Sequence, residues 1–149
     1  MKRTALGAAL LLGSLTARAD CWDRAGAAFN IEPDLLYAIA QQESGLKPDA
    51  VGRNRDGSRD LGLMQINSVH LPRLRAIGID EKRLLGDACL SVMVGASILA
   101  DMMKRYGYSW EAVGAYNAGP APGRHQLRMR YARQVWQRYQ RLRAPTSIR

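Results

Sequence analysis

The sequence predicts a predominantly all-α protein with one folded domain. Apolar residues recur three and four positions apart along most of the chain, which is the spacing of an amphipathic helix. Short segments containing glycine or proline separate these stretches, and no repeat or low-complexity linker divides them. A chain of 149 residues suits a single domain with a hydrophobic core. We therefore expect one helical domain with at most a small hairpin in the 50–61 loop.

The N-terminal segment 1–19 has the composition of an export signal. Lys2 and Arg3 precede a short apolar run, and Ala17-Arg18-Ala19 is typical of a cleavage site. The apolar run is shorter than the ~20 residues that span a bilayer, which argues against a membrane anchor. We expect cleavage after Ala19, a periplasmic location, a folded domain over residues 20–143 and a flexible tail over residues 144–149.

The chain is basic, with a formal net charge of +9. The signal contains three basic residues and no acid, so the mature chain stays positive. This balance favours anionic partners, which outside the cytoplasm are cell-wall polymers and lipid headgroups more often than nucleic acid. Cys21 and Cys89 are the two cysteines, and an even count in an oxidising compartment predicts a disulfide. Two cysteines and two histidines at unrelated spacings make no recognisable metal site.

Two helices are expected at the start of the mature chain. The first covers Cys21 to Phe29, and the second has Pro33 in its first turn and ends near Glu43, where Gly45 follows. The segment from residue 45 to residue 60 holds glycine and proline among charged residues. We expect it to form a long loop and a candidate groove wall.

Four further helices are expected along the rest of the chain. One begins near Leu63, with Pro72 as a kink or interruption. Asp87 is the expected N-cap of a long core helix that ends at Gly107.

The last two expected helices are separated by a short break. Ser109 is placed to cap a short helix that stops at residues 117–120. The final helix is expected over residues 129–142, with aromatic residues at helical spacing packed inward and arginines left on a solvated face.

The glutamate at the end of the second helix is a candidate general acid. Leu36, Ala40 and Glu43 fall at i, i+4 and i+7, so the carboxyl group follows the apolar stripe. Burial and the negative end of the helix dipole both raise the pKa of a carboxyl group. A glutamic acid protonated near neutral pH can donate a proton to a glycosidic oxygen. From spacing alone, an exposed surface glutamate fits equally well.

Three segments, in order, resemble those of a known enzyme family. They are Pro33-Asp34-Leu35-Leu36-Tyr37-Ala38-Ile39-Ala40-Gln41-Gln42-Glu43-Ser44-Gly45, Gly62-Leu63-Met64-Gln65-Ile66-Asn67 and Ala115-Tyr116-Asn117-Ala118-Gly119. From Cys21 to about Tyr139 the chain resembles the goose-lysozyme-like lytic transglycosylases, in particular the small exported kind associated with secretion, conjugation or pilus systems. The resemblance implies a lysozyme-like helical fold and no metal or cofactor.

The resemblance also implies a reaction and roles for residues. The enzyme would cleave the β-1,4 bond between N-acetylmuramic acid and N-acetylglucosamine in peptidoglycan strands and leave a 1,6-anhydro sugar. Glu43 would protonate the leaving oxygen and then accept a proton from the sugar's own 6-hydroxyl. Tyr116 would lie near the acetamido group, and Gln65 and Asn117 would line the groove and hydrogen-bond the sugars or Glu43. The remaining predicted substrate-binding residues are Ser44, Met64 and Asn67.

Several of these residues also have simpler interpretations. Tyr116 can be an ordinary amphipathic core residue, Gln65 a polar group at a helix start and Asn117 a helix C-cap. Many relatives carry serine or threonine at the position of Gly52, so any hydroxyl contact from this loop is unassigned, with Ser58 as the candidate substitute.

A second carboxylate stands before the glycine of the middle segment. If Asp60 faced Glu43 across a water molecule, lysozyme-like hydrolysis would be favoured, whereas the alternative is a solvated or turn-forming aspartate. The polar residues of the same loop alternate like calcium ligands, but Gln65 stands where a closing glutamate is required. We therefore expect no calcium site.

The sequence leaves three functional hypotheses. The leading one is a peptidoglycan lytic transglycosylase that opens the cell wall locally for a secretion, conjugation or pilus apparatus. The second is a hydrolytic muramidase with the same fold, and the third is a non-catalytic wall-binding adaptor. The arginines of the final helix could suggest nucleic-acid binding, but the export signal argues against it. His70 and His125 are interpreted as surface polar groups.

Overall fold

The protein is described by a computed structural model that covers residues 13–145, with side chains from Cys21 onward. Residues 1–12 of the predicted signal and 146–149 of the predicted tail lie outside the described residues. The elements are α1 (Gly13–Phe29), α2 (Pro33–Ser44), β1 (Val51–Arg53), β2 (Arg59–Leu61), β3 (Ile66–Asn67), a 3₁₀ helix (Ser68–His70), α3 (Leu71–Arg75), α4 (Glu81–Gly86), α5 (Ala88–Tyr106), α6 (Trp110–Ala118) and α7 (His125–Arg143). The predicted helical fold class is confirmed.

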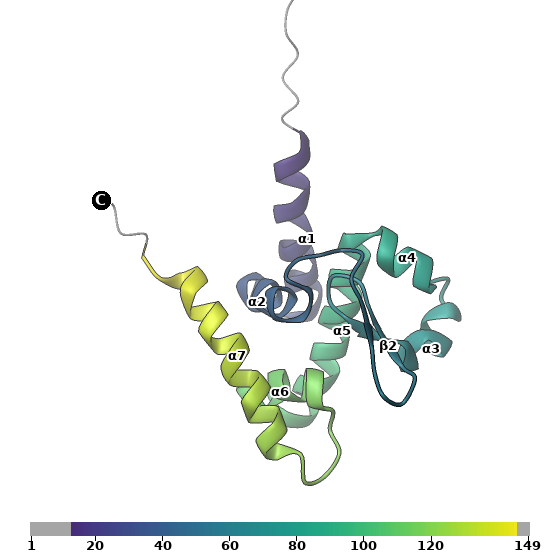
Figure 1. Ribbon diagram of the computed structural model, residues 1–149. Helices are drawn as coiled ribbons and strands as arrows, with labels where there is room; N and C mark the ends of the chain where they lie inside the picture. The colour runs from purple at the N-terminus through teal and green to yellow at the C-terminus, as the bar shows by residue number, and fades with distance from the viewer. Residues whose placement is uncertain (1–12, 146–149) are drawn as a thin grey trace, which may run out of the picture.

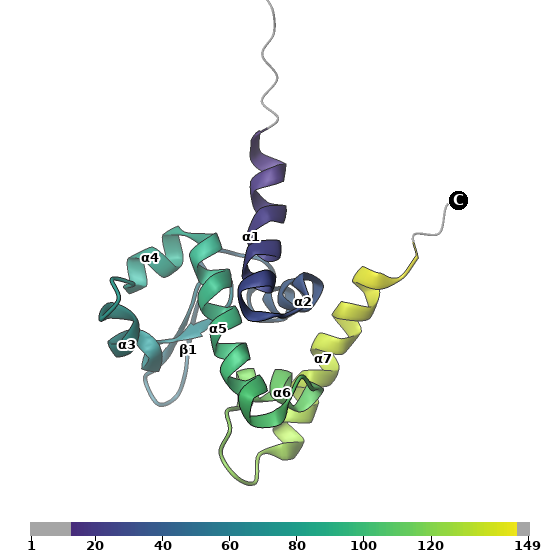
Figure 2. The same cartoon turned by 180° about the vertical axis from the view of Figure 1, so that it is seen from behind.

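Helix α5 forms the centre of the molecule. Figure 1 shows α7 on one side and the sheet with α3 and α4 on the other. The view from behind places α5 between these two sides, with α6 packed near its C-terminal end (Figure 2). The central helix therefore separates a helical side from a sheet side and holds both in place.

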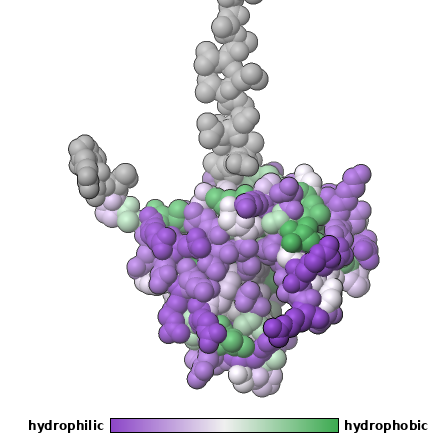
Figure 3. Space-filling model, viewed as in Figure 1, coloured by the Kyte–Doolittle hydropathy of each residue, from purple (hydrophilic) through white to green (hydrophobic). Residues whose placement is uncertain are grey.

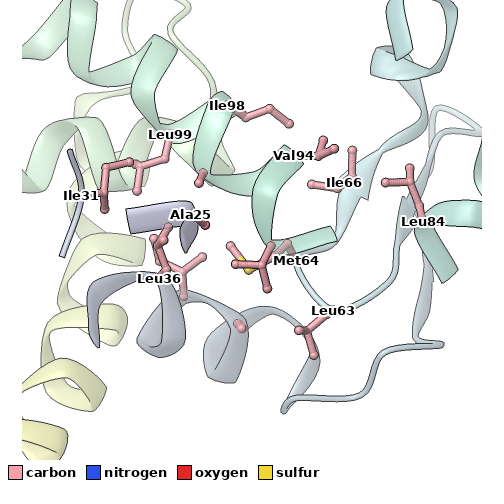
Figure 4. Close-up of a cluster of buried hydrophobic side chains, with 14 of the residues drawn as sticks. Ala25, Ile31, Leu36, Leu63, Met64, Ile66, Leu84, Val94, Ile98 and Leu99 are labelled. Atoms are coloured by element: carbon pink, nitrogen blue, oxygen red, sulfur yellow. The ribbon is translucent and has the colours of Figure 1, made fainter. Parts of the chain in front are cut away.

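The core forms where α1, α2 and α5 meet the loop before β3. Ala25, Leu36 and Leu99, one from each helix, are fully buried in it. Met64 from the loop lies between α2 and α5 (Figure 4). A Cβ atom at Gly95 would lie 2.7 Å from the Met64 Cε atom, so α5 needs a glycine there to accept this side chain. This packing holds the segment 62–67 against α5.

The helix ends follow the capping signals in the sequence. The Asp87 side chain accepts a hydrogen bond from the Leu90 amide at 3.0 Å, and the Ser109 hydroxyl accepts one from the Ala112 amide at 3.2 Å. Each satisfies an amide that has no partner within its helix. Gly45 ends α2 with φ of 61°, a left-handed conformation that glycine adopts at low cost. The predicted caps are confirmed.

The helix predicted to begin near Leu63 is wrong. Gly62 and Gln65 have φ values of 74° and 50°, which interrupt a helix, and Ile66 pairs with Leu61 across β2 and β3. The sheet has three antiparallel strands in the order β1-β2-β3, so it extends beyond the predicted hairpin. Helix α4 was not predicted because Leu84 is its one buried residue, which leaves no apolar periodicity to detect.

Three other differences concern the chain ends and the last helix. Helix α1 begins at Gly13, so a continuous helix crosses the predicted cleavage site after Ala19. Helix α7 begins at His125, before the predicted start at residue 129. The predicted inward packing holds for buried Tyr131 but is wrong for Trp136, which is 40% exposed and contacts Trp110 edge to face.

A disulfide links the first helix to the central one. Cys21 of α1 and Cys89 of α5 are joined, with their Cα atoms 5.3 Å apart. In the chain-entropy description, closing a loop of this length stabilises a fold by about 4 kcal/mol. Over the described residues, no helix has both the length and the apolar character that crossing a membrane requires. Cleavage after Ala19 and the bounds of the domain stay predictions.

We predict that Gly114→Ala destabilises the protein by about 2 kcal/mol or more, because α6 and α7 must separate. A Cβ atom at this position would lie 2.2 Å from the main-chain oxygen of Arg128. Urea unfolding followed by circular dichroism measures the change. Gly86→Ala is the matched control, since its Cβ atom would meet no atom within 4 Å. Equal stability of the Gly114→Ala variant and the unmodified protein would contradict this account of the helix contact.

Candidate active site

A groove of about 750 Å³ lies between the two sides of the molecule. The segments 54–60 and 65–70 contribute one wall, the segment 115–120 with Arg124 contributes the other, and Glu43 lies between them. Hydrophilic side chains dominate the face of the molecule viewed in Figure 3, with apolar patches among them. The volume and the polar walls suit a polar chain molecule.

Glu43 is held in the groove by a tyrosine from the opposite end of the chain. It lies in the last turn of α2, and the Tyr131 hydroxyl of α7 donates a hydrogen bond to Glu43 Oε1 at 2.5 Å. Burial raises the pKa of Glu43 from 4.5 to about 7, and the nearby Asp60 carboxylate also raises it, while the Tyr131 hydrogen bond lowers it. Glu43 therefore exists in both protonation states near neutral pH, as a group that alternately donates and accepts a proton must.

Tyr116 lines the groove, and its hydroxyl proton takes part in a hydrogen bond within the protein. The hydroxyl donates a hydrogen bond of 2.6 Å to the main-chain oxygen of Met64. Burial, with Glu43 and Asp60 adding to it, raises the pKa of Tyr116 well above 10. The phenol is therefore neutral, and its oxygen keeps a lone pair that can accept a further hydrogen bond. Asn117 lies beside it as a further lining residue.

Gln65 lines the groove but uses its amide within the protein. Its Nε2 atom donates to the main-chain oxygens of Ala50 at 3.1 Å and Gly62 at 2.9 Å. A Cβ atom at Gly52 would lie 3.0 Å from the Gln65 Oε1 atom. The absence of a side chain at Gly52 therefore leaves room for the Gln65 side chain. Hydrogen bonds from Gln65 to sugars or to Glu43 stay a prediction.

Ser44 and Met64 are not among the residues that line the groove. The Ser44 hydroxyl donates to the main-chain oxygen of Leu63 at 2.7 Å, which ties the end of α2 to the middle segment. Met64 is fully buried against Gly95. Both residues support the groove from behind, and contact with substrate stays a prediction for them.

Asp60 faces the groove on the sheet side, where amide groups hold it. Its Oδ1 atom accepts from Asn67 Nδ2 at 2.9 Å, and its Oδ2 atom accepts from Asn54 Nδ2 at 2.9 Å. The Ser58 hydroxyl oxygen accepts from the same two amides, at 3.1 and 3.0 Å. Asp60 is thus neither a free loop acid nor a simple turn residue, and Asn67 acts as its positioning partner.

Arg128 supports the opposite wall from inside the protein. It is 6% exposed and donates through Nη1 to the main-chain oxygens of Gly119 at 3.3 Å and Ala121 at 3.1 Å. Its Nε atom donates to Glu111 at 3.0 Å, and its guanidinium lies over the Tyr106 ring, 5.1 Å from the ring centroid. Hydrogen bonds from His125 and Arg128 lower the pKa of Glu111, which therefore stays charged as the buried arginine's partner.

Sequence reasoning missed two of the residues that shape the site. Tyr131 is one of the aromatic residues whose helical spacing predicts core packing, and it is buried, but its hydroxyl reaches Glu43. Arg128 lies just before the predicted start of the last helix, and the charge of arginine favours a solvated side chain, whereas here it is buried. The available signal was Gly114, because a glycine inside a helix often marks the close approach of another segment, which here is α7 at Arg128.

Residues 20–139 match the family described as the Transglycosylase SLT domain. The chain belongs to this family. It is a peptidoglycan lytic transglycosylase, and the resemblance inferred from its three segments is confirmed.

Related proteins support the same placement of this SLT-family chain. Invasion protein IagB of Salmonella typhimurium is 65% identical over 137 residues, covering 92% of this chain and 86% of that protein. Protein IpgF of Shigella flexneri is 50% identical over 130 residues, with 87% and 86% covered. An inactive mutant of lytic transglycosylase Slt from Pseudomonas aeruginosa superposes with a TM-score of 0.67 at 23% identity, over 89% of this chain and 25% of that chain. The last comparison shows a shared fold.

We predict that Tyr131→Phe raises the pKa of Glu43 above its value of about 7, because the hydrogen bond from Tyr131 favours the carboxylate. The pH at which activity falls on the alkaline side should rise correspondingly, since the variant keeps Glu43 protonated to higher pH. The pH profile of kcat/KM for wall digestion measures the shift. Tyr37→Phe, on the face of α2 that packs on Trp22, is the control and should leave the profile unchanged. A profile that moves to lower pH would contradict the assignment.

We also predict that Glu43→Gln stabilises the fold at alkaline pH. The pKa of Glu43 is raised from 4.5 to about 7 by folding, so its contribution to stability is intact below pH 4.5 and is lost as the pH rises through 7. The loss amounts to at most about 3 kcal/mol, which an uncharged amide avoids. Urea unfolding at pH 4 and pH 8 should show a difference between the two proteins only at the higher pH. If the two proteins differed in unfolding free energy by the same amount at both pH values, Glu43 would not be the group that titrates.

Proposed function

We propose that the protein is an exported, periplasmic lytic transglycosylase in which Glu43 acts first as the acid and then as the base, leaving a 1,6-anhydromuramic product. The observation that carries the proposal is the half-buried Glu43 carboxyl group with a pKa of about 7, which lines one groove with Tyr116 and accepts a hydrogen bond from Tyr131. Support for export comes from the signal-like N-terminal composition.

The proposed reaction needs no second carboxylate. Protonated Glu43 gives its proton to the glycosidic oxygen as the bond from that oxygen to the anomeric carbon breaks. The sugar's own 6-hydroxyl oxygen then forms the new bond to the anomeric carbon, and the Glu43 carboxylate accepts the hydroxyl proton. The enzyme returns to its starting protonation state, and water is not consumed. A pKa near 7 suits both the donation and the later acceptance of the proton. The Tyr131 hydrogen bond stabilises the carboxylate that exists between these two transfers.

Tyr116 has a specific place in this scheme. Its hydroxyl proton is directed to the Met64 carbonyl, so its oxygen can accept a hydrogen bond from the acetamido group of the substrate. The oxygen and the electron-rich ring face also stabilise the positive charge that develops at the anomeric carbon. Loss of the ring would therefore weaken the transition state more than the bound substrate.

Asp60 supports hydrolysis as the second candidate reaction. It lines the same groove as Glu43 and raises the pKa of Glu43. A carboxylate positioned in this way could activate a water molecule or stabilise the cation, as in enzymes that use two carboxyl groups. The two reactions leave different ends on the product, since hydrolysis gives a reducing muramic acid and the proposed reaction gives an anhydro sugar.

The proposed biological role is local opening of the cell wall for an envelope-spanning secretion, conjugation or pilus apparatus. The 65% identical Salmonella relative is named for invasion. Small size and a single domain suit an enzyme that is delivered to one place in the wall. The positive charge also favours the anionic wall over neutral surfaces.

We predict that Glu43→Gln reduces digestion of purified sacculi by a factor of about 10²–10⁴, because the amide cannot donate the proton. Binding to sacculi should persist, since the two side chains are nearly isosteric. Release of soluble muropeptides measures cleavage, and their masses identify anhydro or reducing ends. Glu32→Gln is the matched control, since Glu32 is the N-cap at the opposite end of α2.

The outcomes separate the three hypotheses. Anhydro ends with loss of cleavage in the Glu43→Gln variant agree with the proposal. Reducing ends would identify a muramidase, and binding without cleavage by the unmodified protein would identify an adaptor. Cleavage retained by the Glu43→Gln variant would remove Glu43 from its proposed role.

A further inference from the structure

Two arginines line the groove from opposite walls. Arg55 lies in the turn between β1 and β2, and Arg124 lies immediately before α7. Both are exposed, and neither guanidinium has a hydrogen-bond or ion-pair partner within residues 13–145. By contrast, the arginines at positions 59, 128, 138 and 143 all bind acids or amides of the protein. The cations at the groove are therefore available to a ligand.

Both arginines lie on loops that hydrogen bonds hold in place. The turn that carries Arg55 is closed by the Asn54 amide on the Ser58 carbonyl at 2.9 Å and by the Ser58 amide on the Asp56 carboxylate at 2.9 Å. The Arg124 carbonyl accepts from the Arg128 amide at 2.9 Å, and the Arg128 side chain holds the segment just before it. A guanidinium on a fixed loop loses less freedom when it binds.

The charge balance differs between the two walls. Arg55 shares its wall with the Asp56 and Asp60 carboxylates, which offset its charge. The residues of the segment 115–120 that line the other wall carry no charge, so Arg124 stands alone there. Burial, followed by the charge of Arg73, lowers the pKa of the groove residue His70, which is therefore neutral near pH 7. Arg124 is accordingly the stronger anion site.

The amino sugars of a peptidoglycan strand are neutral, because the lactyl carboxyl group of the muramic acid is bonded to a stem peptide. The negative charges of the strand are the carboxylates of those stems, which extend away from the sugar rings. A sugar chain placed beside Glu43 would direct the stems toward the rim of the groove, where the exposed arginines lie. Arginine matches a carboxylate with two parallel hydrogen bonds.

We infer that Arg124, assisted by Arg55, binds carboxylates of the stem peptides, so that the groove selects stem-bearing strands over strands without charged stems. The inference rests on the proposed function, since it assumes that a glycan strand occupies the groove. It makes the two arginines specificity determinants rather than catalytic residues. A free lactyl carboxylate is the other source of the same chemistry, and the experiment separates the two.

The test measures binding of soluble glycan strands to the Glu43→Gln variant, which holds strands without requiring any cleavage. Three strand preparations are compared: intact stems, stems with carboxylates converted to neutral amides, and strands stripped by an amidase, which expose the lactyl carboxylate. We expect intact strands to bind about fivefold more tightly than either of the others, the size of an exposed charged contact.

Second substitutions in the same background assign the effect to residues. Arg124→Gln should remove most of the preference, Arg55→Gln less, and Arg124→Lys should keep part of it because the charge remains. Arg130→Gln, an exposed arginine of α7 outside the groove, makes the same change in net charge and should leave the preference intact. Melting temperatures of the Arg124→Gln and Arg130→Gln variants verify that both are folded.

Three results would overturn the inference. They are equal binding of intact and amidated strands, tight binding of stripped strands, and an equal loss of preference in the Arg124→Gln and Arg130→Gln variants, which would indicate general attraction by a basic surface. Binding is read without catalysis, so failure of the proposed reaction and failure of stem recognition give different results.

Discussion

The hydrogen bond between Tyr131 and Glu43 is the contact on which the rest of the site depends. It joins α2 to α7 across 88 positions of sequence and places the carboxyl group in a partly dry environment. Burial alone favours a permanently neutral acid, whereas a strong donor alone favours a permanent carboxylate. The two effects oppose each other, and the resulting pKa of about 7 lets one residue alternate between both forms.

The remainder of the fold presents two walls to that residue. On the sheet side, the amides of Asn54 and Asn67 fix Asp60, and the Gln65 amide fixes the turn before β3. On the helical side, a buried arginine holds the carbonyl groups of the segment that follows α6. Polar side chains that could contact substrate are thus largely used to shape the backbone. The groove is consequently pre-formed, which lowers the entropy lost on binding.

The sequence predicted those parts of the fold that follow from local rules. Asp87 and Ser109 have the side chains that cap helices, and Gly45 ends α2, so these boundaries could be predicted closely. The region after Leu61 could not, because its form depends on pairing with β2 and on a non-glycine residue, Gln65, with positive φ. Tertiary contacts override local preference in such short segments.

In the candidate site too, features set by local sequence could be predicted, whereas those set by tertiary contacts could not. The apolar stripe of α2 favours a partly buried Glu43, because the whole pattern lies within one helix. The contacts of Tyr131 and Arg128 arise from the docking of α7, which no local pattern records. The sequence indicates Asp60 as a candidate, but its hydrogen bond from Asn67 depends on the strand register Asp60↔Asn67.

Docking of the last helix also sets the order in which the site can form. Helix α7 is the last element along the chain, and it carries the tyrosine that contacts Glu43. In an unfolded chain a glutamate has its ordinary pKa and is ionised at neutral pH. The environment that raises the pKa of Glu43 therefore requires both ends of the domain to be folded together.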